Sequence, residues 1–452
     1  MQRVKLVIIG SGSQFTEFFL QELYKFDEFR GCTLALIDRQ ADRLKQEVKL
    51  AQLLNAAVGW DVTVQGCTDR KEAFEEATHV FAFFAVRSKE AWKKEFEIAN
   101  RHGIYPFEAY TAGAPGLGFA IRHVPVMLDI CADMERICPD AWLIMDNNPL
   151  AKLVAAVNRH TKVKYVGYCN GHELVQLALE QLLDMSDRDS SARAADPVER
   201  EFMVPAGTID MTLAGINHLQ WLLDIRNSKT GEDLYPRVRQ LCQKPEEAPS
   251  GYKFSAEICR RFGYFPSPAD NHIGDYIWIV DDQVKKAFGL VPYPVDQWFG
   301  GRTESDWAKI AASVEDKEAA RHFVTRRRVG WMNLQIARHM LRGVPSYFPA
   351  VNVMNNGVIP NLPLDAVIEV PAVIGPDSVK PLHVGPLPEP AAAICTLHSH
   401  ITNLAAEAAA TGSKELARQA LLLDPFIHSA TVADRLLDDI LDYCRGYETR
   451  FA

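Results

Sequence analysis

The sequence lacks the features that mark membrane, secreted and nucleic-acid-binding proteins. It has no apolar run long enough to cross a bilayer, and Met1 to Leu6 leads directly into an apolar segment without a signal-peptide cleavage site. Its net charge of -9 leaves no excess of the basic residues that bind phosphate backbones. Its nine cysteines have no paired spacing, which indicates reduced thiols. We therefore expect a cytoplasmic protein with no membrane or nucleic-acid partner.

What is present is the composition of a folded protein with more than one domain. Hydrophobic residues make up 48% and charged residues 24%, and there is no repeat or low-complexity tract. A chain of 452 residues is too long for one ordinary core. We expect a first domain over residues 1–190 and a second over 191–452, with the charged segment Arg188 to Glu199 as a linker or insertion.

The first half alternates between buried strands and helices. Val4 to Ile9 is a continuous apolar run, typical of a strand covered on both faces, and helical periodicity follows it. Repeated alternation predicts an α/β fold with an N-terminal Rossmann-type, doubly wound parallel sheet like that of lactate and malate dehydrogenases. A mixed α+β domain should follow it. We expect the glycine-rich stretch Tyr110 to Gly118 to be a loop before a helix from Ala120 to Cys138.

A glycine turn follows the first strand. In Gly10-Ser11-Gly12-Ser13, Gly12 would let backbone approach a pyrophosphate at the helix N-terminus, and the two serines can add hydroxyl donors. The usual third glycine is absent, because Phe15 stands there. Asp38 ends the second strand, where an acid takes the ribose hydroxyls and selects NAD. The alternative is an ordinary strand-to-helix turn.

Two metal-binding side chains stand at turns. Cys169 follows the expected strand Val163 to Tyr168, at the edge where parallel sheets hold ligands, and His218 occupies a later turn. A thiolate and an imidazole suit a divalent transition metal, and two protein ligands would leave positions open to water and substrate. Each also has a simpler interpretation, Cys169 as a small core residue and His218 as a hydrogen-bonded turn histidine.

Two polar loops are further candidates. Asn148 precedes Pro149, which should hold it extended with its amide in the crevice, whereas Asp146 and Asn147 can equally be helix caps. The segment Gly263 to Tyr276 crowds two acids, a histidine and tyrosines around prolines. Such a loop is either a surface turn or a site, and we favour the site.

The order of these motifs resembles glycoside hydrolase family 4, whose members depend on NAD and a divalent metal. Each motif alone is weak, but together they are specific. The resemblance implies NAD and Mn²⁺, or another divalent metal, as cofactors and a homodimer or homotetramer as the assembly. Six parts of the chain carry it: Gly10-Ser11-Gly12-Ser13, Gly113 to Gly116 leading to Arg122-His123-Val124-Pro125-Val126, Asn147-Asn148-Pro149, Gly167-Tyr168-Cys169, Gly215-Ile216-Asn217-His218, and Asn355-Asn356-Gly357 to Asn361-Leu362-Pro363.

The resemblance also implies a reaction and its residues. The reaction is hydrolysis of an O-glycosidic bond by NAD-assisted oxidation at C3, metal-assisted removal of the C2 proton, and elimination at C1. Cys169 and His218 would hold the metal. Asp270 would be the base, with Tyr264 and Tyr276 in reserve. Substrate binding falls to a further set: Asn148, Asn170, Arg87 and Arg122.

The sequence departs from the family pattern at the general acid. Tyr110 and Asn170 stand where family members carry acids or histidine, so His172, Glu108 or Tyr110 would supply the proton. The loop around Asp270 resembles the branch that acts on unphosphorylated α-glycosides. We expect an α-glycosidase for a non-phosphorylated hexose or hexuronic acid. The alternatives are a 6-phospho-glycosidase of the same family, an NAD-dependent 2-hydroxy-acid dehydrogenase, and a homologue that binds NAD and sugar without turnover.

Overall fold

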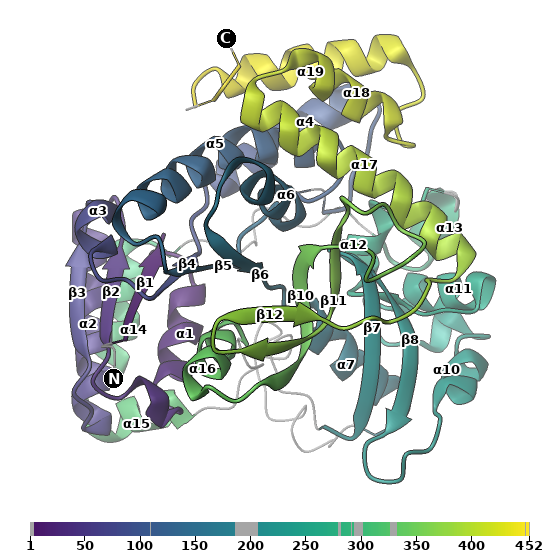
Figure 1. The fold of residues 1–452 in the computed structure, drawn as a ribbon. Helices are drawn as coiled ribbons and strands as arrows, with labels where there is room; N and C mark the ends of the chain where they lie inside the picture. Colours follow the sequence, from purple (N-terminus) through teal and green to yellow (C-terminus); the bar gives the residue numbers. More distant parts are fainter. Residues whose placement is uncertain are drawn as a thin grey trace.

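One mixed β-sheet runs through both halves of the chain in this computed structural model (Figure 1). Its strand order is β3-β2-β1-β4-β5-β6-β10-β11-β7-β8-β9, and β12 pairs with β11. This arrangement confirms the predicted α/β class. The structure describes residues 4–108, 110–185, 207–278, 282–290, 292, 302–325, 332–447 and 449–451.

The first six strands are parallel and have the order of a doubly wound nucleotide-binding sheet. The strands β1, β2 and β4 are short apolar runs with almost every residue buried, because helices cover both faces. The strands are β1 (Lys5–Ile9), β2 (Thr33–Ile37), β3 (Thr63–Cys67), β4 (His79–Ala82), β5 (Trp142–Met145) and β6 (Lys164–Gly167). The helices among them are α1 (Phe15–Leu23), η1 (Asp27–Phe29), α2 (Ala41–Val58), α3 (Arg70–Phe74), α4 (Ser88–Arg101), α5 (Gly113–Ile137), α6 (Leu150–His160) and α7 (Gly171–Leu182).

The second half continues the sheet with antiparallel strands. Its strands are β7 (Ile209–Ile216), β8 (Leu219–Asn227), β9 (Pro266–Ser267), β10 (Ser346–Met354), β11 (Val367–Gly375) and β12 (Ser378–Pro381). Its helices are α10 (Tyr235–Leu241), η2 (Pro245–Glu247), α11 (Lys253–Phe262), α12 (Asp270–Gly274), α13 (Asp282–Ala287), α14 (Glu304–Ser313), α15 (Lys317–Thr325), α16 (Asn333–Arg342), α17 (Glu389–Thr411), α18 (Lys414–Leu423) and α19 (Ala430–Cys444).

Helices from both halves cover the parallel strands. On one face, α1 and α2 share an apolar core with α14, α15 and α16 from the second half. On the other face, α5 and α6 pack beneath α17. The helices α18 and α19 lie across the end of the molecule beside α4 and α5 (Figure 1). The two halves of the sequence therefore share cores as well as a sheet.

The strand β10 joins the two halves through an antiparallel pairing with β6, where Asn352 stands opposite Gly167. The expected domain boundary at residues 190 and 191 lies outside the described residues, as does the linker from Arg188 to Glu199. The boundary therefore stays a prediction.

The helix α5 begins seven residues earlier than expected. The expected glycine-rich loop is largely the first turns of this helix, which starts at Gly113 rather than Ala120. A Cβ at Gly116 would lie 2.9 Å from the carbonyl carbon of Thr111, and one at Gly118 would lie 2.3 Å from Glu95 Oε1. The glycines there permit close packing and do not form a flexible loop, which corrects the sequence interpretation.

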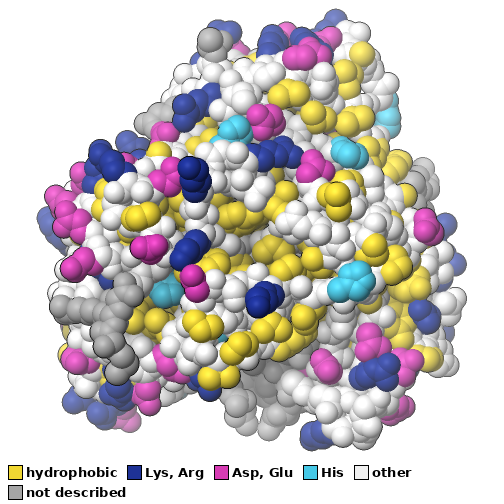
Figure 2. All heavy atoms as spheres, in the orientation of Figure 1, with side chains coloured by type: hydrophobic (Ala, Val, Ile, Leu, Met, Phe, Trp, Pro, Cys, Tyr) yellow, Lys and Arg dark blue, Asp and Glu magenta, His cyan; other side chains and the backbone are white. Residues whose placement is uncertain are grey.

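The surface is consistent with the charge pattern of the sequence. On the face shown in Figure 2, acidic and basic side chains are interspersed, and apolar side chains gather across the middle. Among the described helices, none combines the length and the apolar character needed to span a bilayer. All nine cysteines lie in described residues and all are free thiols, as expected.

Candidate active site

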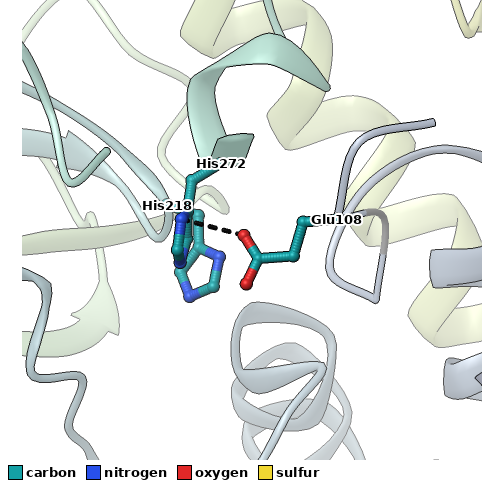
Figure 3. Close-up of side chains that lie close together, drawn as sticks. All are labelled: Glu108, His218 and His272. Carbon is teal, nitrogen blue, oxygen red and sulfur yellow. Dashed lines mark ion pairs between the residues drawn. The ribbon is translucent and has the colours of Figure 1, made fainter. Parts of the chain in front are cut away.

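Two imidazoles and a carboxylate meet beside the sheet (Figure 3). The donor atoms of Glu108, His218 and His272 lie within 4.8 Å of one another. Nδ1 of His272 is 2.8 Å from Oε2 of Glu108, and the two imidazole centroids are 4.4 Å apart. Such a set can bind a divalent transition metal or transfer a proton.

The hairpin between β7 and β8 presents His218. Asn217 and His218 form the two-residue turn between Ile216 and Leu219, which pair directly. His218 has a φ of +64°, a left-handed conformation that is uncommon outside glycine and recurs at functional turns. Its Nδ1 lies 3.2 Å from the hydroxyl of Thr111. The predicted turn is therefore present, and it aims the imidazole at the loop before α5.

The loop that carries Glu108 is held by its backbone. The carboxylate of Asp275 accepts hydrogen bonds from the N–H groups of Phe107 and Glu108, both at 2.8 Å. The indole N–H of Trp92 donates to the Glu108 carbonyl, also at 2.8 Å. Because Asp275 directly follows α12, which contains His272, one short segment supplies both an imidazole and the support for its carboxylate partner.

Burial and positive neighbours keep His218 neutral. Its pKa lies well below the ordinary value because of burial, reinforced by His272 and Lys152. The ammonium of Lys152 donates to the carbonyl of Thr111. Burial lowers the pKa of Lys152 to about 8, against the effect of Asp424. A neutral imidazole is the form that ligates a metal.

Of the two reserve tyrosines, Tyr276 lies in this site. Its hydroxyl is 3.2 Å from Thr111 Oγ1 and 3.4 Å from the Asn217 carbonyl, and burial raises its pKa. Tyr264 instead packs against Tyr235, with ring centroids 6.1 Å apart, and against the guanidinium of Arg239.

Cys169 reaches the same neighbourhood from the end of β6. The thiol is partly buried, and burial followed by Glu369 raises its pKa well above the ordinary value. Hydrogen bonds from the Gly171 backbone and the Asn217 side chain act in the opposite direction. A Cβ at Gly171 would lie 3.0 Å from Cβ of Pro268, so this glycine lets the loop before α12 approach. Asn217 thus links Cys169 to the turn that carries His218.

The other candidate residues, which follow β5 and β6, have different surroundings. Oδ1 of Asn148 accepts a hydrogen bond from the Leu150 N–H at 3.3 Å. Asn170 is the N-cap residue of α7, without a capping bond from its side chain. His172 lines a cavity of about 310 Å³ with Glu173 and Gln176, and burial lowers its pKa to about 4. The cluster of Glu108, His218 and His272 does not border this cavity among its described lining residues.

Asp270, the expected base, makes structural hydrogen bonds. Its carboxylate accepts from the N–H groups of Phe254 and Ser255 at 2.9 and 2.7 Å, and from the Ser255 hydroxyl at 2.8 Å. It thereby caps the first turn of α11, and burial raises its pKa to about 6. Its role as the base stays a prediction that this geometry does not favour. His272, two residues later, faces the cluster instead.

The two arginines assigned to substrate binding lie in different environments. Arg122 is fully buried, donates to both oxygens of Glu95 at 2.9 Å and donates to the Val86 carbonyl at 2.6 Å. The structure places it in an interior ion pair, and its role in substrate binding stays a prediction that this geometry does not favour. Arg87 is exposed and precedes α4 with a φ of +44°.

The glycine turn after β1 lies beside Asp38, as expected. Gly10 has a φ of +80°, and a Cβ there would lie 2.4 Å from Cα of Phe84. The Gly12 N–H donates to Asp38 Oδ2 at 3.0 Å. The guanidinium of Arg43 pairs with Asp38 and lies 2.2 Å from where a Gly12 Cβ would be.

The two serines of this turn make hydrogen bonds within the protein. The hydroxyl of Ser11 is buried and donates to Glu47. Ser13 Oγ accepts the N–H of Phe15 at 3.3 Å. The hydroxyl hydrogen of Ser11 is therefore engaged within the protein, whereas Ser13 only accepts a hydrogen bond. The role of these serines as hydroxyl donors stays a prediction.

The sequence interpretation missed His272 and gave Glu108 only a reserve role. A signal was available, because His272 precedes Asp275 and Tyr276 by three and four residues. That spacing places polar side chains on one face of a helical turn. The contacts of Thr111 and Lys152 had no comparable sequence signal.

Comparisons with known proteins agree with this fold. Residues 5–185 match the model "Family 4 glycosyl hydrolase", and residues 213–427 match "Family 4 glycosyl hydrolase C-terminal domain". The chain is 28% identical to an alpha-galactosidase of Bacillus subtilis (strain 168), over 97% of this chain and 96% of that protein. It is 27% identical to an alpha-glucosidase of Erwinia rhapontici, over 96% of each. A probable 6-phospho-beta-glucosidase of Bacillus subtilis (strain 168) is 25% identical, over 99% of this chain and 98% of that protein.

Solved structures show the same fold. A 6-phospho-alpha-glucosidase from gut microorganisms, in complex with NAD and Mn²⁺, has a TM-score of 0.75 at 20% identity and 98% coverage of each chain. A 6-phospho-beta glucosidase from Thermotoga maritima, with manganese, NAD⁺ and glucose-6-phosphate, has a TM-score of 0.74 at 20% identity, over 98% of this chain and 99% of that chain. NAD and Mn²⁺, the expected cofactors, are those bound in these complexes. The two family models together span most of the chain, which belongs to the family 4 glycosyl hydrolases and is a glycosidase.

Proposed function

We propose that this glycosidase cleaves an α-glycoside of a non-phosphorylated hexose or hexuronic acid, with NAD and a divalent metal, preferentially Mn²⁺, as cofactors. The observation that carries the proposal is the meeting of Glu108, His218 and His272 beside the turn that contacts Cys169. The complexes of similar fold with NAD and Mn²⁺ support the cofactors. The alpha-galactosidase and alpha-glucosidase relatives support the sugar class.

Cys169 and His218 are the proposed metal ligands. The imidazole of His218 is neutral, and the Thr111 hydroxyl engages its Nδ1, which orients the ring. A thiolate and a neutral imidazole suit a divalent transition metal. When bound, the metal supplies Lewis acidity that makes the C2 proton of an oxidised sugar removable.

The turn from Gly10 to Ser13 is the proposed site of the dinucleotide. Gly12 has no Cβ, and the guanidinium of Arg43 lies beside it, paired with Asp38. Asp38 stands where the ribose hydroxyls are expected. When bound, NAD supplies reversible oxidation at C3 of the sugar and is not consumed.

Proton transfer falls to the pair Glu108 and His272. Their 2.8 Å contact lets one group hold a proton while the other orients it toward the leaving oxygen. The neutral phenol of Tyr276 is a hydrogen-bond donor at the same place. Tyr110 and Asn170 stand where other family members carry an acid or a histidine, and in this assignment Glu108 supplies the proton in their place.

A panel of substrates tests the proposal. Nitrophenyl α- and β-glycosides, uronides and 6-phosphoglycosides are incubated with the protein, NAD⁺, Mn²⁺ and a reductant. Cleavage of an unphosphorylated α-glycoside, dependent on both cofactors, is the expected result. Cleavage restricted to 6-phosphoglycosides would assign the phosphorylated class, and stoichiometric NADH release with a hydroxy acid would assign a dehydrogenase. Absence of cleavage throughout would overturn the proposal. The homodimer or homotetramer stays a prediction that light scattering tests.

A further inference from the structure

A row of buried polar side chains crosses the sheet beneath the hairpin turn. Gln220 pairs with Gly215, Gly215 with Glu369, Glu369 with Asn352, and Asn352 with Gly167. Directly paired residues point to the same face of a sheet. The exposed fractions of Gln220, Glu369 and Asn352 are 1%, 1% and 0%. One carboxylate and two amides therefore share one buried face.

The two glycines of the row permit close approach. A Cβ at Gly167 would lie 2.8 Å from Cβ of Asn352, so this glycine leaves room for one of the polar side chains. A Cβ at Gly215 would lie 2.4 Å from the Leu219 carbonyl oxygen, so this glycine lets the backbone of β8 approach. Burying polar groups in a sheet costs free energy unless they are hydrogen-bonded. Polar residues nevertheless occupy these buried positions, which indicates a specific use.

Asn217 connects the row to the site. Its side chain is 2% exposed, and its Nδ2 donates to Glu369 Oε2 at 2.9 Å. The same side chain also lies near enough to Cys169 to act against the rise in the pKa of its thiol. A carboxamide has two N–H hydrogens on one nitrogen, so one can serve Glu369 and the other the sulfur. Because Glu369 Oε2 accepts from Nδ2, Glu369 determines which way round this amide lies.

We propose that Glu369 is a positioning residue for the metal site, which aims the Asn217 N–H at the sulfur of Cys169 and fixes the turn that presents His218. The inference rests on the proposed role of Cys169 and His218 as metal ligands. Partners of this kind, one bond removed from the metal, typically change metal affinity by about 10- to 100-fold. Glu369 itself touches neither substrate nor metal.

Cobalt binding tests the proposal, because Co²⁺ bonded to a thiolate gives a sulfur-to-metal absorption. The variant Glu369→Gln keeps the side-chain shape but can present either an oxygen or an N–H to Asn217. We expect the Co²⁺ dissociation constant to rise about tenfold or more and the sulfur-to-metal absorption to weaken. NAD binding should be unchanged. The matched control is Glu180→Gln, which alters another fully buried carboxylate, one that accepts the Thr208 N–H at 3.1 Å.

The outcomes distinguish failure of the positioning role from failure of the proposed function. If the native protein binds Co²⁺ with the sulfur absorption and Glu369→Gln does so equally well, the positioning role is overturned while the proposed function stands. If the native protein gives no such absorption, the metal role of Cys169 fails and this inference fails with it. If Glu369→Gln does not fold, Asn217→Asp replaces it, because a carboxylate has no N–H for the sulfur. An unchanged absorption in Asn217→Asp would equally overturn the proposal.

Discussion

Asp275 fixes the backbone of Glu108, because its two carboxylate oxygens accept the N–H groups of Phe107 and Glu108 at 2.8 Å each. The variant Asp275→Asn would retain one acceptor oxygen and set an NH₂ group against a backbone N–H. We expect kcat to fall about 10- to 100-fold and stability to fall by about 1–3 kcal/mol. Turnover and urea unfolding measure the two effects. A stability loss without a change in kcat would show that these bonds do not position the carboxylate.

The carboxyl group of Glu108 should matter most for poor leaving groups. In Glu108→Gln the amide cannot give a proton to the departing oxygen, a contribution of about 10²- to 10⁴-fold for general acid catalysis. We expect that loss for alkyl glycosides and a much smaller one for nitrophenyl glycosides, whose leaving groups need little help. Equal losses for both classes would contradict the assignment of a general acid.

Replacing the Cys169 thiol should remove metal dependence without removing the dinucleotide. The variant Cys169→Ser exchanges a soft ligand for a hydroxyl, so we expect activity at saturating Mn²⁺ to fall to background while NAD affinity stays within twofold. Equilibrium dialysis with Mn²⁺ and NAD titration by fluorescence measure both. Cys67→Ser is the control, because Cys67 is another partly buried thiol and lies in β3. Retained activity in Cys169→Ser would exclude this ligand.

The two interpretations of Asp270 predict different responses. If Asp270 caps α11, Asp270→Ala should cost about 1–2 kcal/mol of stability, whereas Asp270→Ser should recover part of that loss because serine is itself a capping residue. If Asp270 is the catalytic base, both variants should lose activity equally. We expect unfolding free energy to separate Asp270→Ala from Asp270→Ser, with kcat following stability. A loss of about a thousandfold in kcat for both, with stability intact in Asp270→Ser, would restore the catalytic role.

Arg122 should affect stability and leave the Michaelis constant unchanged. The variant Arg122→Met leaves the buried carboxylate of Glu95 without its partner, which typically costs about 3–5 kcal/mol. Adding Glu95→Leu removes that unpaired charge and should recover much of the loss. Urea unfolding of the single and double variants, with KM for the cleaved glycoside, tests this. A raised KM at unchanged stability would return Arg122 to substrate binding.

Hydrophobic periodicity in the sequence predicted the parallel sheet. Its buried strands appear as continuous apolar runs, and the helices between them have apolar residues that recur at helical spacing. The prediction failed at the start of α5, where glycines were interpreted as a loop although Gly116 and Gly118 lie in the helix and pack closely against Thr111 and Glu95. A glycine in a helix and a glycine in a loop look alike until the neighbouring surface is known.

The site was predictable where chemistry and position coincide along the chain. Cys169 follows β6 and His218 occupies the turn after β7, and Asn217, beside His218, acts on the pKa of the Cys169 thiol. The spacing of His272 from Asp275 and Tyr276 was a signal, but it did not rank His272 above Asp270, because both lie in one polar loop. Their contacts differ because Asp270 binds the start of α11, 15 and 16 residues away in the chain, whereas His272 contacts the distant Glu108.

The pairing of β6 with β10 has a consequence for how the chain can be divided. Asn352 lies opposite Gly167, so a cut between the two halves would leave both strands with unpaired backbone groups along a new edge. Each fragment would also uncover apolar surface that helices of the other half now cover. The turn from Gly10 to Ser13 and the turn at Asn217 and His218 thus belong to one cooperative structure, and we expect neither half to fold when expressed alone.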